Sequence, residues 1–390
     1  MIRALGVALI AVTTPVRAQQ TDTSRVRADS GRAFVPGGMY DKPFQSRLFG
    51  RTAIGGYAEA HARFEKVDGK RETAGFDAKR FNLFTATTVS DFVRIGAELE
   101  VEEGGEEIKL EFAAIDLKLH QALAIRGGMV LSPLGRFNLS HDSPLNEFTD
   151  RPLVSTDLLG VALSEAGFGA LGTTSLGGGR LTYEAYATNG FHAGLIDDSP
   201  EGTRIPLGRG NFEDANGSPA LVGRVAWSPL FGHEVGVSAH HGAYNVFSSG
   251  GTPIDKRRNL SIVVIDAETS VAGIRLMAEG AVATIDIPES LRGIYAGRQR
   301  GFFLEGIRDF GRGWIGTMPT SSFAAKARAD YVDFDADIVG QSTAQVTVGA
   351  NFRPTQDTAL KFDYVRGRGR DRFNNLAQHA FVLFSLATYF

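Results

Sequence analysis

Charged side chains recur at every second position in several stretches of this chain, and each stretch has an apolar opposite face. In residues 92–102, Arg94, Glu98 and Glu100 share one face, while the apolar residues between them share the other. A basic side chain that faces lipid at mid-membrane costs about 2–4 kcal/mol, so these charges are expected to face water. The residues predicted in this way to line a pore are Arg94, Glu98, Arg126, Arg224, Arg275, Glu279, Lys326, Arg328, Lys361 and Asp363.

Two interpretations of this lining are open. Its basic members could attract anions while its acidic members balance or repel them. Alternatively, any water-filled barrel needs a polar wall of mixed charge, and for most positions this explanation suffices. In residues 108–119 the charges change phase, from Lys109 and Glu111 to Asp116 and Lys118. A β-bulge near residues 113–114 would return both pairs to one face.

Residue types suited to catalysis occur without convincing spacing. Ser140, His141 and Asp142 have the types of a nucleophile, a base and an orienting acid, but sequence neighbours rarely adopt that geometry. His240 and His241 point to opposite faces of a predicted strand, so they cannot jointly chelate a metal. The acidic run of residues 102–107 suits a solvated turn better than a divalent-ion site. We expect no catalytic residues, no metal and no cofactor. The alternative is an outer-membrane barrel enzyme of the lipase or protease type that uses these serine and histidine residues.

The elements that would position these side chains are strands. From residue 52 to the end, alternating segments separated by turns have lengths near the ~9–11 residues of a tilted transmembrane strand. The pattern predicts an all-β protein, a transmembrane antiparallel β-barrel of about sixteen strands, or eighteen if residues 287–321 contribute two more. The predicted strands are residues 52–64, 76–89, 92–102, 108–119, 122–131, 165–176, 181–191, 220–228, 234–244, 259–267, 271–286, 301–310, 322–334, 343–352, 358–366 and 378–390.

The last predicted strand, residues 378–390, is aromatic-rich, lacks Pro and Gly, and ends on Phe390. A bare apolar strand at a sheet edge invites aggregation, and a closed barrel removes the edge by pairing the last strand with the first. We therefore expect closure of the barrel through this segment.

The predicted connections alternate in length, short at one end of the barrel and long at the other, as in outer-membrane barrels. Residues 65–75 and 367–377 are among the predicted long loops, and residues 268–270 form a predicted short turn. The longest connection follows the fifth strand, over residues 132–164, and a loop of this length is uncommon without a function. Its charged residues are the predicted pore constriction: Arg136, Asp142, Asp150 and Arg151. A loop-fixing ion pair is an equally good explanation for Asp150 and Arg151.

Composition places the protein in the cell envelope. Residues 1–18 have a basic start, a short apolar run and a small residue at the cleavage point, as in a secretory signal peptide. We expect a periplasmic lead-in over residues 19–51 and the barrel over 52–390. The formal net charge of −3 disfavours a nucleic-acid partner, and the absence of cysteine excludes disulfides.

Several short motifs are distinctive: IGGYAEAH at 54–61, RGGMVLSPLG at 126–135, TDRPL at 149–153, EAGFG at 165–169, YEAYATNG at 183–190, GRVAWSP at 223–229 and LKFDYV at 360–365. Together they resemble the phosphate-selective porin O/P-like family of bacterial outer-membrane porins. The resemblance implies a sixteen-strand porin, often trimeric, whose loop after the fifth strand folds into the lumen. It also implies that the barrel assembly machinery recognises Phe390. It does not fix phosphate selectivity, which depends on lumen residues outside these motifs.

The sequence thus supports two functions of different class. The leading hypothesis is an outer-membrane porin for passive diffusion of small hydrophilic solutes, with a lean toward anions such as phosphate. Its partners would be outer-membrane lipid and lipopolysaccharide, the assembly machinery, the solutes and further copies of the chain in a homotrimer. The alternatives are the barrel enzyme and a structural barrel with a plugged lumen.

Overall fold

The computed structural model describes residues 39, 42–43, 46–48, 51–199, 202–210 and 212–390. The predicted signal peptide (1–18) lies outside these residues, as does most of the predicted lead-in (19–51). None of the helices in the described part of the chain is long or apolar enough to cross a membrane.

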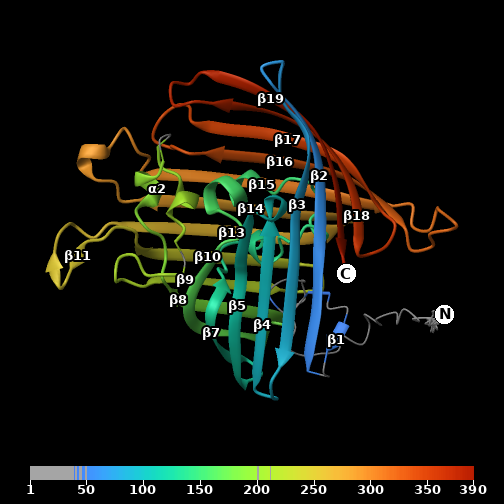
Figure 1. Ribbon diagram of the computed structural model, residues 1–390, viewed down its shortest axis with the longest axis horizontal. Helices are drawn as coiled ribbons and strands as arrows, with labels where there is room; N and C mark the ends of the chain where they lie inside the picture. The colour runs from blue at the N-terminus through green and yellow to red at the C-terminus, as the bar shows by residue number, and fades with distance from the viewer. Residues whose placement is uncertain (1–38, 40–41, 44–45, 49–50, 200–201, 211) are drawn as a thin grey trace, which may run out of the picture. The chain divides into compact units, whose positions relative to one another are not determined.

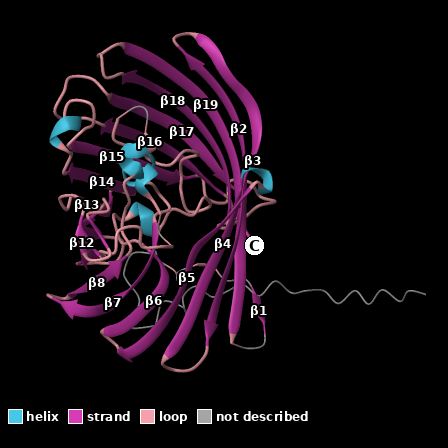
Figure 2. Ribbon diagram, turned by 60° about the vertical axis from the view of Figure 1, so that its left-hand side comes forward, coloured by secondary structure: helices cyan, strands magenta, loops and turns pink. Residues whose placement is uncertain are grey.

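Seventeen strands in the described part of the chain form one antiparallel sheet, and sixteen of them close into a barrel (Figures 1 and 2). Each strand pairs with its sequence neighbours, and β19 pairs with β2 to complete the ring. The barrel strands are β2 (Thr52–Val67), β3 (Lys70–Thr88), β4 (Val93–Glu102), β5 (Glu107–His120), β6 (Leu123–Leu131), β7 (Ser164–Leu176), β8 (Gly179–Thr188), β9 (Ala220–Ser228), β10 (Glu234–Ala243), β13 (Asn259–Val271), β14 (Ile274–Ile285), β15 (Arg298–Phe310), β16 (Ser322–Asp333), β17 (Ser342–Arg353), β18 (Thr358–Arg370) and β19 (Leu376–Tyr389).

The remaining elements are short. The strand β1 (Ser46–Leu48) pairs with the start of β2, and β11 (Ser248–Ser249) with β12 (Thr252–Pro253) forms a small hairpin in a loop. The helical turns are η1 (Glu103–Gly105), η2 (Phe137–Leu139), η3 (Val154–Leu159), α2 (Gly194–Asp197), η4 (Ile205–Gly208) and η5 (Glu289–Leu291).

Alternation gives each strand an outward apolar face and an inward face. In β18, Leu360, Phe362 and Tyr364 are 38–42% exposed on the outside, while Lys361 and Asp363 are buried inside. Strand pairing around the whole ring satisfies the backbone hydrogen-bonding groups, which is the condition for a sheet to stand in lipid. The sequence therefore places its apolar side chains where a bilayer would contact them.

All sixteen predicted strands correspond to strands of the barrel, so the prediction of about sixteen strands is confirmed and the eighteen-strand option is wrong. Three predicted connections are misplaced. Residues 367–377 are not a long loop, because β18 continues to Arg370 and β19 begins at Leu376. Residues 65–75 are not a long loop, because β2 and β3 continue as a polar hairpin to the two-residue turn Asp68-Gly69, both at positive φ. The turn expected at 268–270 lies instead at Ala272-Gly273, because β13 continues past its apolar part. Polar strand ends outside an apolar band carry no hydrophobic alternation, so the sequence pattern under-predicts their length.

The bulge predicted near residues 113–114 lies slightly earlier. The pairing of β4 with β5 skips Glu111, since Glu98 faces Phe112 and Leu99 faces Leu110. Glu111, Phe112 and Asp116 are all buried as a result, so the change of phase returns both sets of polar residues to the interior.

Both ends of the barrel chain lie at the end with the shorter connections. Phe390 exchanges backbone hydrogen bonds with Gly56 at 2.9 and 3.2 Å, and its ring stacks on Phe81 at 5.4 Å. The opposite end carries the long connections 132–163, 189–219 and 244–258. One loop departs from the rule, because residues 311–321 form a longer connection at the short end, where Trp314 packs against Phe310 and Phe323.

Candidate functional site

The connection after β6, residues 132–163, is called the inner loop here because its side chains pack against the inward faces of the barrel strands. Asn138 joins its two ends: the side-chain amide donates to the carbonyls of Ser132 and Leu163 at 2.8 and 2.9 Å, and its oxygen accepts from Leu163 N–H at 2.8 Å. Figure 2 shows several helical turns between the strands of the ring, with others at its edges. The polar, proline-rich sequence thus forms an ordered segment inside the barrel.

One side of the inner loop is apolar. Phe137, Val154 and Leu158 are buried in a cluster with the inward residues of β13–β15, and the rings of Phe137 and Phe303 meet edge-to-face at 6.0 Å. The Glu279 carboxylate accepts from Phe137 N–H at 3.0 Å. Phe191, Leu195, Ile196 and Ile205 of the next long loop join the same cluster. This part of the lumen is therefore filled by close packing.

Glu147 joins the other side of the inner loop to the wall. Its carboxylate contacts Arg275 at 2.6 Å, Arg353 at 3.1 Å and Asn351 at 2.7 Å. Burial by itself raises the pKa of Glu147, but Arg353 and Arg275 outweigh it and lower the pKa to about 2. Glu147 is therefore ionised at any physiological pH, and it joins β14 and β17 through the loop.

Residues 143–148 of the inner loop bind the basic side chains of β16 and β18. The ring of Phe148 lies under Lys326 and Arg328, at 4.9 and 4.6 Å from their charged groups. Lys326 donates to the carbonyl of Glu147 at 2.5 Å, and Lys361 donates to the carbonyl of Ser143 at 2.7 Å. These cations fix the loop, so they are not available to a solute.

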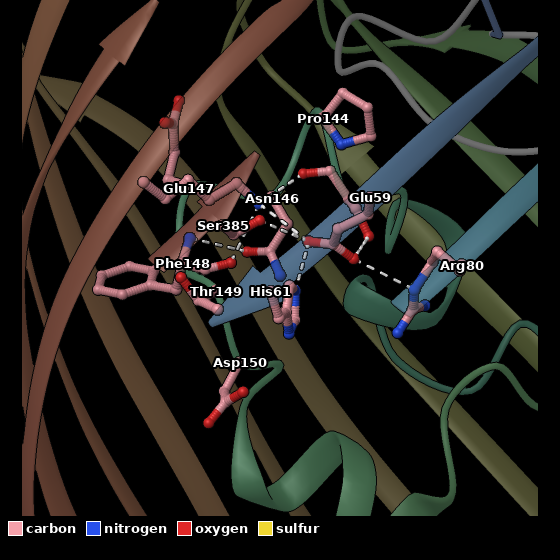
Figure 3. A network of polar contacts seen from close by, with 12 residues as sticks. Glu59, His61, Arg80, Pro144, Asn146, Glu147, Phe148, Thr149, Asp150 and Ser385 are labelled. Atoms are coloured by element: carbon pink, nitrogen blue, oxygen red, sulfur yellow. Dashed lines mark hydrogen bonds and ion pairs between the residues drawn. The ribbon is translucent and has the colours of Figure 1, made fainter. Parts of the chain in front are cut away.

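A second network joins the loop to β2 and β3 (Figure 3). Glu59 contacts Arg80 at 3.2 Å, His61 at 2.9 Å and Ser385 at 2.9 Å, and it accepts from the Ser143 hydroxyl at 2.5 Å. The sequence analysis did not single out these residues. The alternation of Tyr57, Glu59 and His61 with alanines in β2 is the signal that would have found them.

The four residues of the predicted constriction separate into two pairs. Arg136 and Asp142 are buried; Arg136 contacts Glu268 at 3.3 Å, and Asp142 accepts from Tyr389 at 3.0 Å and pairs with Lys42. Asp150 pairs with Arg63, and the two side chains are 28% and 31% exposed to solvent. Arg151 is also partly exposed. Asp150 therefore has an ion-pair partner, Arg63, and water reaches this pair.

The ten predicted lining residues all lie on the inward face, and eight of them are buried. Arg126 holds Asp116 with two hydrogen bonds of 2.7 and 2.8 Å, and Arg224 contacts Asp266 and Glu234. Arg94 and Arg275 keep more exposure. The buried set is Glu98, Arg126, Arg224, Glu279, Lys326, Arg328, Lys361 and Asp363. Because the buried cations have acidic or carbonyl partners, the wall resembles a mixed-charge lining more than a row of free anion sites.

The residues considered for catalysis do not assemble. His141 is buried, with Nε2 2.8 Å from Glu111 and Nδ1 2.8 Å from the carbonyl of Asn138, and Ser140 donates to the carbonyl of Arg136. His240 is buried against Phe191, while His241 is exposed and contacts Ser261, so the two face opposite sides as expected. No group of three metal-ligating side chains is found among the described residues. Lys109, at 2.8 Å from Glu107 and 3.4 Å from Glu102, partly neutralises the acidic turn.

A cavity of about 750 Å³ opens at the end of the barrel with the long connections. Arg204, Arg370 and Arg372 contribute to its lining, and the Arg204 guanidinium lies 4.3 Å from the ring of Phe334. Two acids, Asp157 and Asp371, also line it. Asp371 accepts from the backbone N–H groups of residues 373 and 375, so turn formation engages its carboxylate.

Comparisons with known proteins agree on the fold. No family model matches the chain. An uncharacterized protein of Aquifex aeolicus (strain VF5) is 25% identical over 350 residues, covering 83% of this chain and 77% of its own length. Solved structures with the same barrel include OprB of Pseudomonas putida (TM-score 0.58, 10% identity, 92% and 100% coverage of this chain and that one). The outer membrane channel DcaP of Acinetobacter baumannii (0.56, 14%, 88% and 99%) and an anion-selective porin from Comamonas acidovorans (0.53, 12%, 87% and 99%) are further examples.

Proposed function

We propose that the protein is an outer-membrane porin that lets small hydrophilic solutes diffuse through its lumen. The observation that carries this proposal is the ion pair Arg63–Asp150. One side chain comes from the barrel wall and the other from the inner loop, and both are about a third exposed to solvent inside a closed barrel. Glu102 and Arg151 are partly exposed nearby. Charges in contact with water inside a barrel with an apolar outer face are the features of a hydrophilic passage.

Similarity of fold supports the same proposal. The solved barrels named above include an anion-selective porin and an outer membrane channel, and their fold is similar to that of this chain. On this proposal the protein has a secretory leader, lies in the outer membrane among lipid and lipopolysaccharide, and passes through the barrel assembly machinery with Phe390 as its signal. A homotrimer is part of the proposal, since an outer membrane protein of Vibrio cholerae with this fold has a trimer form.

The more specific proposal is a preference for anions over cations. The resemblance of the short motifs to the phosphate-selective porins supports it. The cavity at the end with the long connections also supports it, because three arginines and two aspartates line it. A mouth lined by excess positive charge raises the local concentration of anions and their rate of entry. The basic residues of the wall contribute less, because loop carbonyls and acids already bind them.

Conductance of the purified protein in a planar bilayer tests both levels of the proposal. We expect discrete open channels in KCl and, under a salt gradient, a reversal potential on the anion side. Arg370→Gln with Arg372→Gln should move that potential toward the cation side, while Arg312→Gln, a change in the exposed turn at the opposite end, should move it less. Preparations that insert into the bilayer and show no openings would refute the porin; cation preference would refute the anion lean alone.

One observation favours a second candidate, a barrel whose lumen is closed. The apolar cluster between the inner loop and β13–β15 fills part of the lumen with buried side chains. If this packing extended across the lumen, the protein would be structural and would not conduct. The same bilayer experiment separates the two candidates.

A further inference from the structure

A row of basic side chains crosses the outer surface of the barrel near the end with the long connections. Register places Arg366 of β18 beside Ala380 of β19, Ala380 beside Lys66 of β2, and Lys66 beside Arg71 of β3. Arg366 is in phase with Leu360, Phe362 and Tyr364, so it points outward. The three cations Arg366, Lys66 and Arg71 are called the basic row; all are exposed.

The neighbouring row toward mid-barrel is apolar. Tyr364, Val382, Phe64 and Ala74 are paired in the same order across the same four strands. Tyr364 and Phe64 are 38% and 40% exposed, as expected for side chains in contact with lipid. Two residues along a strand advance it by about 6.8 Å, so a layer of charge lies directly above a layer of hydrocarbon-compatible surface.

In the described part of the chain, no acid forms an ion pair with the basic row. None of its three members makes a hydrogen bond or ion pair with another described residue. Glu72, the extra residue of the bulge opposite Lys66, has no ion pair with them, and Asp68 in the adjacent turn accepts from Gln378 N–H. Lys66 and Arg71 are directly opposed, which is unfavourable for like charges unless an anion lies between them. Arg368, also exposed, lies one step further out.

Another outward face at the same end of the barrel is arranged differently. Arg298 contacts Asp337 at 2.8 Å, and Arg300 contacts Asp333 at 3.0 Å, so these arginines are neutralised by the protein itself. The exposed arginines of β15 near this end of the barrel thus form ion pairs, whereas Arg366 of β18 does not. The unpaired set has room for an anion from outside, because the small Ala380 separates Arg366 from Lys66.

We propose that the basic row binds the phosphate groups of a phosphorylated lipid of the outer leaflet, whose acyl chains lie against the apolar row beneath. The inference goes beyond solute diffusion, although it shares with the proposed function the outer-membrane location. Guanidinium groups bind phosphate through paired hydrogen bonds, and ammonium groups add point charge. A lipid fits better than a free phosphate, since only a lipid also uses the apolar row.

Lipid binding by matched variants tests the proposal. Lys66→Gln with Arg366→Gln removes two unpaired cations, and Arg298→Gln with Arg300→Gln removes two paired ones with the same change in net charge. Affinity for purified lipopolysaccharide in detergent should fall about 25-fold in the first variant, from about fivefold per cation. It should change less than about twofold in the second. Lys66→Arg with Arg366→Lys should retain binding, which separates loss of charge from a folding defect.

Two further probes identify the ligand. Enzymatically dephosphorylated lipopolysaccharide should bind the unmodified protein as weakly as the intact lipid binds the Lys66/Arg366 variant. Equal loss of affinity in both double variants would overturn the proposal, because it would indicate general electrostatics. Inorganic phosphate that competes as well as the lipid would overturn the lipid assignment, and a change of oligomeric state in the first variant alone would point to a second copy instead. Binding is measured without reference to conduction, so a protein that failed to conduct would leave this test intact.

Discussion

The inward faces of β13 and β4 have opposite character, although both strands belong to the same ring. β13 presents the buried apolar residues Leu260, Ile262 and Val264, whereas β4 presents Glu98 and Glu100. The inner loop accounts for the difference, because its apolar residues pack toward β13–β15 and its polar residues toward β2 and β16–β18. The inward face of a barrel strand therefore matches whatever fills the lumen beside it, and in the charged half the Arg63–Asp150 pair keeps contact with water.

The largest effect is expected from breaking the apolar half. Phe137→Ala removes a ring that is 3% exposed and packed on Phe303, and such a substitution costs about 3–5 kcal/mol. The free energy of unfolding in detergent should fall by that amount, and loosening of the inner loop should increase single-channel conductance.

Phe373→Ala is the control for this change, since Phe373 is 78% exposed in a turn and its loss should cost under about 0.5 kcal/mol. A cost below about 1 kcal/mol for Phe137→Ala would mean that the packing beside β13 does not hold the inner loop.

The charged half should respond to acid. The folded pKa of Glu147 is about 2 against an ordinary 4.5, so its contribution is present above about pH 4.5 and is lost as pH falls toward 2. A shift of this size corresponds to about 3 kcal/mol. Unfolding measured from pH 6 to pH 2.5 should show this decline, with the conductance rising as the loop loosens.

Glu147→Gln isolates this group. It should lower the stability at pH 6 by about 3 kcal/mol, because Arg353 and Arg275 lose their carboxylate, and it should flatten the decline between pH 4.5 and 2.5. An unchanged acid profile in this variant would assign the pH dependence to other carboxylates.

The smallest effect on stability is expected at the pair in contact with water. Arg63→Gln should cost no more than about 1 kcal/mol, since the Arg63–Asp150 pair is partly exposed and screened. Its effect should appear in ion selectivity, with the reversal potential moving toward the cation side; Asp150→Asn should move it the opposite way. If both variants kept the original potential, ions would not pass this pair.

The strands could be predicted from the sequence because the alternation of apolar and polar residues indicates which side chains face lipid. Leu360, Phe362 and Tyr364 outside Lys361 and Asp363 form such a pattern, and the burial observed in β18 follows it. The inward character of β13 could not be predicted in this way, because both of its faces are apolar over residues 262–265. The roles of Arg136 and Asp142 also depended on partners such as Glu268 and Tyr389, which are more than a hundred residues away.

A closed all-β ring of about sixteen strands follows from the sequence alone, because lipid on one side and polar groups on the other impose a period of two on most strands. The tertiary structure alone decided which inward charges meet water. The inner loop returns into the ring and pairs Glu147 with Arg275 and Arg353, and it covers Lys326 and Lys361 with its carbonyls. Such contacts depend on where the loop comes to rest, and no local periodicity encodes that position.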